Sequence, residues 1–136
     1  RGAVIGLTRD TKPAHFVRAA LEALAYQTRD LLDALARDGA PKFSVLKVDG
    51  GVTANAFAMQ FVADICEVTV ERPAFQEMTA LGAARLAALG VGLIDDLEPR
   101  NEEAPSVWTP RMPEEQREAL LGGWRRAVKA AIVAAQ

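Results

Sequence analysis

The chain has 136 residues and a formal net charge of −2; half of the residues are apolar and a quarter are charged. This length suits one domain with a single hydrophobic core, and the sequence lacks the basic patch of a nucleic-acid-binding protein and any apolar run that would span a bilayer. The single cysteine, Cys66, excludes an internal disulfide and fits a reducing compartment, so we expect a cytoplasmic protein. The chain opens at Arg1 without methionine or an apolar leader, so we expect no signal peptide and a piece of a longer polypeptide.

The first part of the chain predicts one long helix. Residues 2–8 form a short apolar entry, which we expect to be an extended piece or a turn that packs on the core. Thr11 is the expected N-cap, and Pro13 is tolerated in the first helical turn. Over residues 14–37 apolar side chains recur with the helical period, and Gly39 provides the C-terminal stop. The stripe expected to face the core contains Val17, Leu21, Leu24, Thr28, Leu31 and Leu35, broadened by Ala20, Ala25 and Leu32.

A strand, a glycine turn and a helix follow. Residues 43–48 are apolar and rich in β-branched side chains, which indicates a strand. Asp49-Gly50-Gly51 breaks it, and the helix is expected over residues 53–65, where apolar side chains resume with helical spacing. The residues expected on its buried face are Ala54, Phe57, Ala58, Phe61, Val62 and Ile65.

A second strand and a further helix are predicted next. Residues 67–71 alternate between polar and apolar side chains, as in a half-buried or edge strand. The helix is expected over residues 77–89, with Gln76 or Thr79 near its start. Its middle consists of unusually small residues, and Gly82 costs about 1 kcal/mol relative to alanine in a helix interior. Such a helix suits a place where another backbone or a flat ligand comes close.

The last third of the chain predicts a long surface connection and a C-terminal helix. The connection covers residues 90–112 and contains the structure breakers Pro99, Asn101, Pro105 and Pro110. Trp108 is expected to anchor it to the body of the protein. The last helix opens at Pro113-Glu114-Glu115, where acidic side chains suit the positive end of the helix dipole. Its expected buried face contains Leu120, Leu121, Trp124, Val128, Ala131 and Ile132.

Alternation of helices and strands predicts an α/β fold with parallel strands. Two strands do not make a stable sheet by themselves. We therefore expect further strands to come from chain upstream of this sequence or from a partner.

The turn at Asp49-Gly50-Gly51 is the candidate ligand site, because ligands of open α/β sheets bind at the carboxyl ends of strands. Two glycines let a ligand approach the backbone, and the following helix offers unpaired N–H groups to an anion. The alternative is a sharp turn without a ligand. The amide of Asn55 would bind the ligand or satisfy the helix start. Asp49 and Asp64 would make polar contacts near a ligand, or else Asp49 sets the turn and Asp64 faces water.

Other site chemistries find little support. His15 is the only histidine, and its place near a helix start favours packing or capping over catalysis. Cys66 is expected to be a small buried apolar group, and no cysteine or histidine spacing predicts zinc binding. The sequence also lacks the glycine motifs of Walker-type and Rossmann-type nucleotide sites.

Three stretches of the sequence resemble the C-terminal part of the FGGY carbohydrate kinases. They are Arg1-Gly2-Ala3-Val4-Ile5-Gly6-Leu7-Thr8-Arg9 with Gln27-Thr28-Arg29-Asp30, then Val48-Asp49-Gly50-Gly51-Val52-Thr53-Ala54-Asn55, and Val70-Glu71-Arg72-Pro73 with Thr79-Ala80-Leu81-Gly82-Ala83-Ala84. Together they span nearly the whole chain. Within the family, the first stretch is most similar to glycerol kinases.

The resemblance implies an incomplete ribonuclease-H-like, actin-like ATPase domain with a C-terminal helix. Residues 1–97 would form part of the C-terminal nucleotide-binding domain, and residues 98–136 a loop and helix packed on it. Gly50, Gly51 and Asn55 would bind ATP, with Gly51 and Asn55 against the adenosine part. Ala56 departs from many relatives, which carry a second asparagine there, so a secondary polar contact is in doubt.

The resemblance also implies an ATP-dependent kinase that phosphorylates glycerol to sn-glycerol 3-phosphate. Its catalytic residues, its Mg²⁺ site and its glycerol-binding residues would lie upstream, so this chain alone would be inactive. The implied partners are the N-terminal part of the same polypeptide, ATP or ADP, and further copies in a dimer or tetramer. The rival interpretations are another FGGY sugar kinase, acting on xylulose, ribulose or gluconate, and a non-catalytic dimerisation module.

Overall fold

A computed structural model describes residues 2–75, 77–98 and 103–134 of the chain. The predicted roles of Gln76, Pro99 and Asn101 lie outside this range, and so does Arg1 of the first matching stretch. Within the described residues no helix is both long and apolar enough to cross a membrane.

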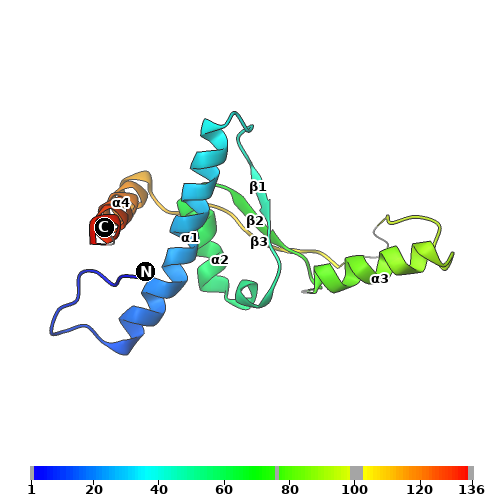
Figure 1. The fold of residues 1–136 in the computed structure, drawn as a ribbon, viewed down its shortest axis with the longest axis horizontal. Helices are drawn as coiled ribbons and strands as arrows, with labels where there is room; N and C mark the ends of the chain where they lie inside the picture. Colours follow the sequence, from blue (N-terminus) through cyan, green and yellow to red (C-terminus); the bar gives the residue numbers. More distant parts are fainter. Residues whose placement is uncertain (1, 76, 99–102, 135–136) are drawn as a thin grey trace.

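A mixed sheet of three strands forms the centre of the fold (Figure 1). Strands β1 (Val45–Lys47) and β2 (Thr69–Arg72) pair in parallel, with Leu46 opposite Val70. This confirms the predicted parallel pair. Strand β3 (Ser106–Trp108) lies antiparallel on the other side of β2, with Trp108 opposite Val70. The prediction that residues 90–112 are only a connection is therefore wrong at β3, although Trp108 does anchor this segment to the core.

Four α-helices surround the sheet unevenly. Helices α1 (Pro13–Arg37) and α2 (Ala56–Cys66) lie side by side between the sheet and helix α4 (Glu114–Ala134), and helix α3 (Met78–Gly90) extends away from the opposite side (Figure 1). α3 buries none of its residues, and a Cβ atom added at Gly82 would meet nothing within 4 Å. Gly82 therefore has no close neighbour outside its own helix among the described residues.

Helix α1 begins one residue later than predicted. Its N-cap is Lys12, and the Lys12 N–H donates to Nδ1 of His15 over 3.1 Å. The hydroxyl of Thr11 instead accepts from the Thr8 N–H over 2.9 Å. Thr11 as N-cap is therefore wrong, and the capping interpretation of His15 is confirmed. The entry segment 2–8 has no regular structure and exposes its apolar side chains, so the alternative of a turn packed on the core is wrong.

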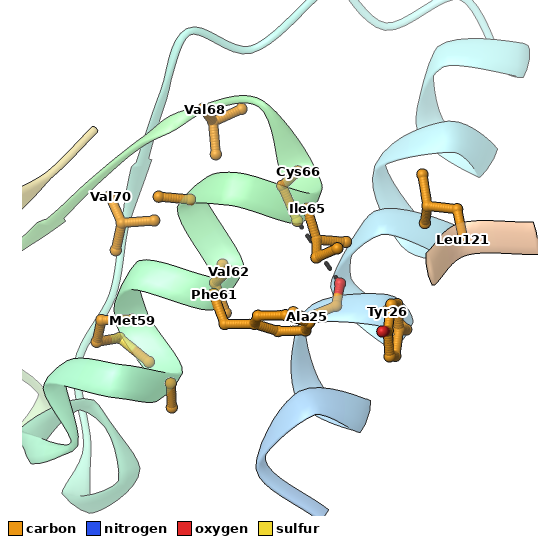
Figure 2. Packing of buried hydrophobic residues seen from close by; sticks show 12 residues of the cluster. Ala25, Tyr26, Met59, Phe61, Val62, Ile65, Cys66, Val68, Val70 and Leu121 are labelled. Carbon is orange, nitrogen blue, oxygen red and sulfur yellow. Dashed lines mark hydrogen bonds between the residues drawn. The ribbon is translucent and has the colours of Figure 1, made fainter. Parts of the chain in front are cut away.

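The hydrophobic core lies mainly between α1, α2 and β2 (Figure 2). Helix α2 contributes most of it, including Phe61, Val62 and Ile65 as predicted, whereas Phe57 stays 45% exposed. Helix α1 contributes Ala25 and Tyr26 as its only fully buried residues among those described. Much of the leucine-rich stripe predicted for α1 is exposed instead, namely Val17, Leu24, Leu31 and Leu35. The predicted stripe is therefore buried only on the side that carries Ala25, where the small side chain permits close contact with α2, and Leu21 and Leu32 are partly buried against the core.

An aromatic stack joins three helices. The ring of Tyr26 on α1 lies edge-on to Phe61 on α2, with the ring centroids 5.6 Å apart, and is stacked on Trp124 of α4 at 5.2 Å. The Trp124 indole N–H donates to Asp30 on α1 over 2.7 Å, so its polar edge is satisfied. Of the face predicted for α4, only Leu121 is fully buried and Ile132 is exposed.

Glu67 forms a junction between α1, α2 and α4. It follows α2 in the left-handed conformation, with φ 56° and ψ 39°, which is unusual for a residue with a side chain. Its carboxylate accepts from Arg29 of α1 over 3.0 Å and pairs with Arg117 of α4 over 3.2 Å. These two ion pairs hold the strained residue in place.

Asp64 forms a second junction, between α2 and the segment that leads into α4. It is buried, and its Oδ1 accepts from the backbone N–H groups of Arg111 and Met112 over 2.7 and 3.2 Å. Gln60 of α2 also donates to it over 3.0 Å. The alternative that Asp64 faces water is therefore wrong, and its hydrogen bonds serve the fold.

Candidate functional site

The predicted ligand turn is a 3₁₀ helix, η1 (Gly51–Ala54), placed between β1 and α2. The helix predicted from residue 53 therefore starts later, at Ala56. The Gly50 carbonyl accepts from both the N–H and the hydroxyl of Thr53, over 3.0 and 2.7 Å. The Val52 carbonyl accepts from the Asn55 N–H over 3.1 Å. The turn is thus closed by its own hydrogen bonds, with the Thr53 side chain buried beneath it.

The two glycines of the turn differ in what their backbone requires. Gly50 has φ 91° and ψ 167°, a conformation that is essentially restricted to glycine. Gly51 has an ordinary φ, it is exposed, and a Cβ atom there would meet nothing within 4 Å. Within the described chain nothing demands a glycine at Gly51, so its bare backbone is free to receive a group from outside.

Asn55 is the N-cap of α2. Its Oδ1 accepts from the Ala58 N–H over 3.1 Å, so the capping alternative from the sequence holds for this oxygen. The side chain is exposed, and its amide nitrogen makes no hydrogen bond within the described part of the chain. The cap fixes the rotamer and leaves the NH₂ group available as a donor beside Gly51.

Arg72, at the end of β2, supports the turn from below and was not identified from the sequence. Its Nη1 donates to the Thr53 carbonyl over 2.9 Å, and its Nη2 donates to the Ser106 hydroxyl over 3.1 Å. Its guanidinium also lies over the Trp108 ring, 5.6 Å from the centroid. The pairing of β3 with β2 brings Ser106 and Trp108 to Arg72. The alternation of residues within a single strand does not predict which strands pair, so the sequence did not indicate these contacts.

The remaining predicted residues stay apart from the turn or serve the fold. The Asp49 side chain is exposed and makes no hydrogen bond or ion pair with any described residue. Cys66 is buried against the Ala25 carbonyl (Figure 2), and burial raises the pKa of its thiol to about 12, which makes it a poor nucleophile. No group of three or more His, Cys, Asp or Glu side chains gathers as a metal site among the described residues.

A cavity of about 520 Å³ lies between the sheet and α3, and it does not include the turn. Its lining includes Lys47, Glu71, Phe75, Met78 and Arg85. The turn is exposed at Gly51, and a Cβ atom added at Gly50 or Gly51 would meet no described atom within 4 Å.

Comparison with known proteins matches residues 1–91 to the C-terminal domain of the FGGY family of carbohydrate kinases. The chain belongs to this family. The predicted resemblance is therefore confirmed, and the turn at Gly50 and the helix α3 both fall within the FGGY domain.

Several relatives of this FGGY chain are glycerol kinases. The glycerol kinase of Staphylococcus epidermidis is 51% identical over 132 residues, which cover 96% of this chain and 26% of that protein. Glycerol kinase 2 of Pseudomonas aeruginosa is 50% identical, covering 95% of this chain and 26% of that protein. The chain thus spans about a quarter of the length of the curated relatives it matches.

Solved structures of FGGY kinases share the fold. The structure of Plasmodium falciparum glycerol kinase with ADP matches with a TM-score of 0.75 and 35% identity, over 94% of this chain and 26% of that one. A ligand-bound xylulose kinase from Lactobacillus acidophilus matches with a TM-score of 0.66 and 26% identity, over 100% of this chain and 29% of that one. The predicted α/β class and actin-like ATPase fold are confirmed.

Proposed function

We propose that this chain is the C-terminal part of an ATP-dependent glycerol kinase, which transfers the γ-phosphoryl group of ATP to glycerol to give sn-glycerol 3-phosphate. The observation that carries the proposal is the 51% identity to a glycerol kinase over nearly the whole chain. The relatives among solved xylulose and gluconate kinases are more distant, at 22–28% identity. The substrate assignment therefore favours glycerol over a sugar.

Within that enzyme, Gly50, Gly51 and Asn55 would form part of the adenosine-binding wall. Gly50 permits the turn, Gly51 lets the nucleotide contact the backbone, and the amide of Asn55 donates to the nucleotide. The ADP in the related Plasmodium falciparum structure and the unobstructed backbone at Gly51 support this assignment. The Mg²⁺ ion would be held by residues outside this chain, and when bound it neutralises charge on the transferring phosphates.

The rest of the polypeptide would supply the opposite wall and the catalytic groups. Transfer in this reaction depends on holding the phosphates and the acceptor hydroxyl in line, with little covalent work for the protein. Residues 1–97 would belong to the nucleotide-binding domain and residues 98–136 would pack on it, which the β2–β3 pairing and the bonds of Asp64 support. A cytoplasmic location and a dimer or tetramer remain predictions.

The first test is an ATP-consumption assay on the full-length enzyme with glycerol, xylulose, ribulose and gluconate. Asn55→Ala and Asn55→Asp are assayed in parallel, because aspartate retains the helix cap but lacks the amide donor. We expect turnover with glycerol, and a rise in the KM for ATP of roughly threefold to tenfold in both variants, since each loses one hydrogen bond. Only the alanine variant should also lose about 1 kcal/mol of stability.

The outcomes separate substrate from site. Turnover with a sugar substrate but not with glycerol would show that the protein is another FGGY sugar kinase. An unchanged KM for ATP in Asn55→Asp would remove Asn55 from the nucleotide site. No turnover with any substrate would favour the non-catalytic module.

A further inference from the structure

The guanidinium of Arg72 connects three separate parts of the chain. It lies at the end of β2 and bonds to Thr53 in η1 and to Ser106 in β3, while its face covers the ring of Trp108. The Arg72 Nε is buried and has no hydrogen-bond partner among the described residues. The guanidinium of Arg72 therefore faces η1 and the sheet, where its hydrogen-bond acceptors lie.

The turn continues directly from β1, and the Val48 N–H just before it donates to the Glu71 carbonyl of β2 over 2.9 Å; Arg72 adds a link to the middle of the turn. The bonds between Gly50 and Thr53, and between Val52 and Asn55, close the turn upon itself. Among the described residues, the bond from Arg72 to the Thr53 carbonyl is the only hydrogen bond from residues 49–54 to a strand of the sheet. Thr53 stands two residues before Asn55 and two after Gly51. A hydrogen bond to its carbonyl therefore restrains the backbone midway between the two residues proposed to contact the nucleotide.

We infer that Arg72 is a positioning residue for nucleotide binding, acting through Thr53 to hold Gly51 and Asn55 at a fixed place relative to the sheet. The inference rests on the proposed function of the same turn. Each terminal nitrogen of Arg72 donates to a protein acceptor, so we assign the guanidinium to holding the turn and not to contacting the nucleotide.

Arginine suits this role and lysine does not. The planar guanidinium presents donors in a rigid fork, so it reaches the Thr53 carbonyl and the Ser106 hydroxyl at the same time and stacks on Trp108. An ammonium group is a single point donor on a flexible stem and would hold one acceptor at a time. The charge of the residue is therefore less important than its geometry.

The test compares Arg72→Met, Arg72→Lys and Ser106→Ala with the wild type in the full-length enzyme. Binding of ADP is measured by calorimetry, and KM is measured separately for ATP and glycerol. We expect Arg72→Met to weaken ADP binding and to raise the KM for ATP by roughly tenfold, because a charged hydrogen bond that fixes the turn is lost. Arg72→Lys and Ser106→Ala should shift both values in the same direction but less, with the KM for glycerol unchanged.

Arg117→Met is the matched control. Arg117 is also largely buried and also has an unpartnered Nε, but it pairs with Glu67 at the junction with α4 and does not contact the turn. We expect this variant to lower Tm without changing ADP binding. Hydrogen exchange gives a second readout: the Thr53 and Asn55 amides should exchange faster in Arg72→Met and at the wild-type rate in Arg117→Met.

Each result decides the inference. If Arg72→Met lowers Tm as Arg117→Met does while ADP binding stays unchanged, Arg72 is merely structural and the inference is wrong. If Arg72→Met does not fold, Arg72→Lys and Ser106→Ala decide it, and unchanged ADP affinity in both overturns it. Asn55→Asp distinguishes failure of the positioning role from failure of the nucleotide site. If ADP affinity falls in Asn55→Asp but not in the Arg72 variants, only the positioning role is contradicted. If ADP affinity is unchanged in the variants of both residues, the nucleotide site itself is contradicted.

Discussion

The adjacent glycines Gly50 and Gly51 differ in backbone conformation, although they look equivalent in the sequence. Gly50 is required by its own backbone, with φ 91°, whereas Gly51 has an ordinary φ and open space where a Cβ would stand. The need for glycine is thus conformational at Gly50, whereas the described residues impose none at Gly51. Under the proposed function, a bound nucleotide would impose the need for glycine at Gly51.

Alanine substitutions separate these two roles. Gly50→Ala should lower the free energy of unfolding by about 1–3 kcal/mol, because alanine is strained at this φ and ψ. Gly51→Ala should leave stability within about 0.5 kcal/mol of the wild type and weaken ATP binding, because its methyl group enters the proposed adenosine contact. Chemical unfolding and ADP calorimetry on the full-length enzyme measure both effects. Unchanged ADP affinity in Gly51→Ala would argue against the contact.

Single residues were partly predictable from the sequence. The turn and Asn55 follow from local chemistry, since glycine after a strand and asparagine before a helix have few other uses. Arg72 and Asp64 were not predictable in their roles, because their partners lie 19 to 48 residues away in the chain. Thr11 was assigned as the cap because threonine favours this position, but the local hydrogen bond to Thr8 takes its hydroxyl.

At the scale of elements, the junction at Glu67 holds three helices with one carboxylate. Its side chain is 37% exposed, while Arg29 and Arg117 are 20% and 10% exposed. Burial tends to lower the pKa of Arg29, and hydrogen bonds to Asp33 and Glu67 outweigh it, so the net effect raises that pKa. Arg29 therefore stays charged and needs its acidic partners.

Glu67→Gln tests this junction. We expect it to lower the free energy of unfolding by about 1–3 kcal/mol, because two mostly buried guanidinium groups lose a charged acceptor. Glu22→Gln is the comparison, since Glu22 pairs with Arg18, which is 67% exposed, four residues away on the same helix. Its effect should not exceed about 0.5 kcal/mol. Equal losses in the two variants, measured by chemical unfolding, would show that the junction contributes no more than a surface pair.

The helices were predictable in place but not in orientation. The 3.6-residue period locates α1, α2 and α4 well, because long amphipathic segments have few alternatives. In α1, however, apolar residues lie on more than one side, and only Ala25 and Tyr26 are fully buried among the residues described. Which side of α1 is buried depends on its tertiary contact with α2. The pattern of apolar residues within one helix does not predict that contact.

At the scale of the whole molecule, the described residues leave several surfaces uncovered. The turn is exposed at Gly51, α3 buries none of its residues, and α1 exposes Val17 and Leu31. The β3 strand was missed for a similar reason: it has three residues inside a breaker-rich segment, and only its pairing with β2 makes it a strand. Short strands of this kind are defined by neighbours more than by composition.

Residues 1–136 alone should therefore show no glycerol phosphorylation and only weak nucleotide affinity. Preorganised groups on both sides of a phosphate are needed to stabilise its transfer, and the described chain offers one side. A coupled assay with ATP and glycerol, run beside the full-length enzyme at equal concentration, measures this directly. Detectable turnover by the isolated chain would contradict it.

The position of β2 has a consequence for synthesis on the ribosome. β2 can pair with β1 once both have emerged from the ribosome, but its other edge stays open until residues 106–108 have also emerged and β3 can close it. During that interval the nascent chain displays an unpaired strand edge, the type of surface on which polypeptides aggregate. Chaperone occupancy on the nascent chain should accordingly be highest after β2 has emerged from the ribosome and before residues 106–108 have emerged, and a released chain that ends between residues 73 and 105 should be insoluble.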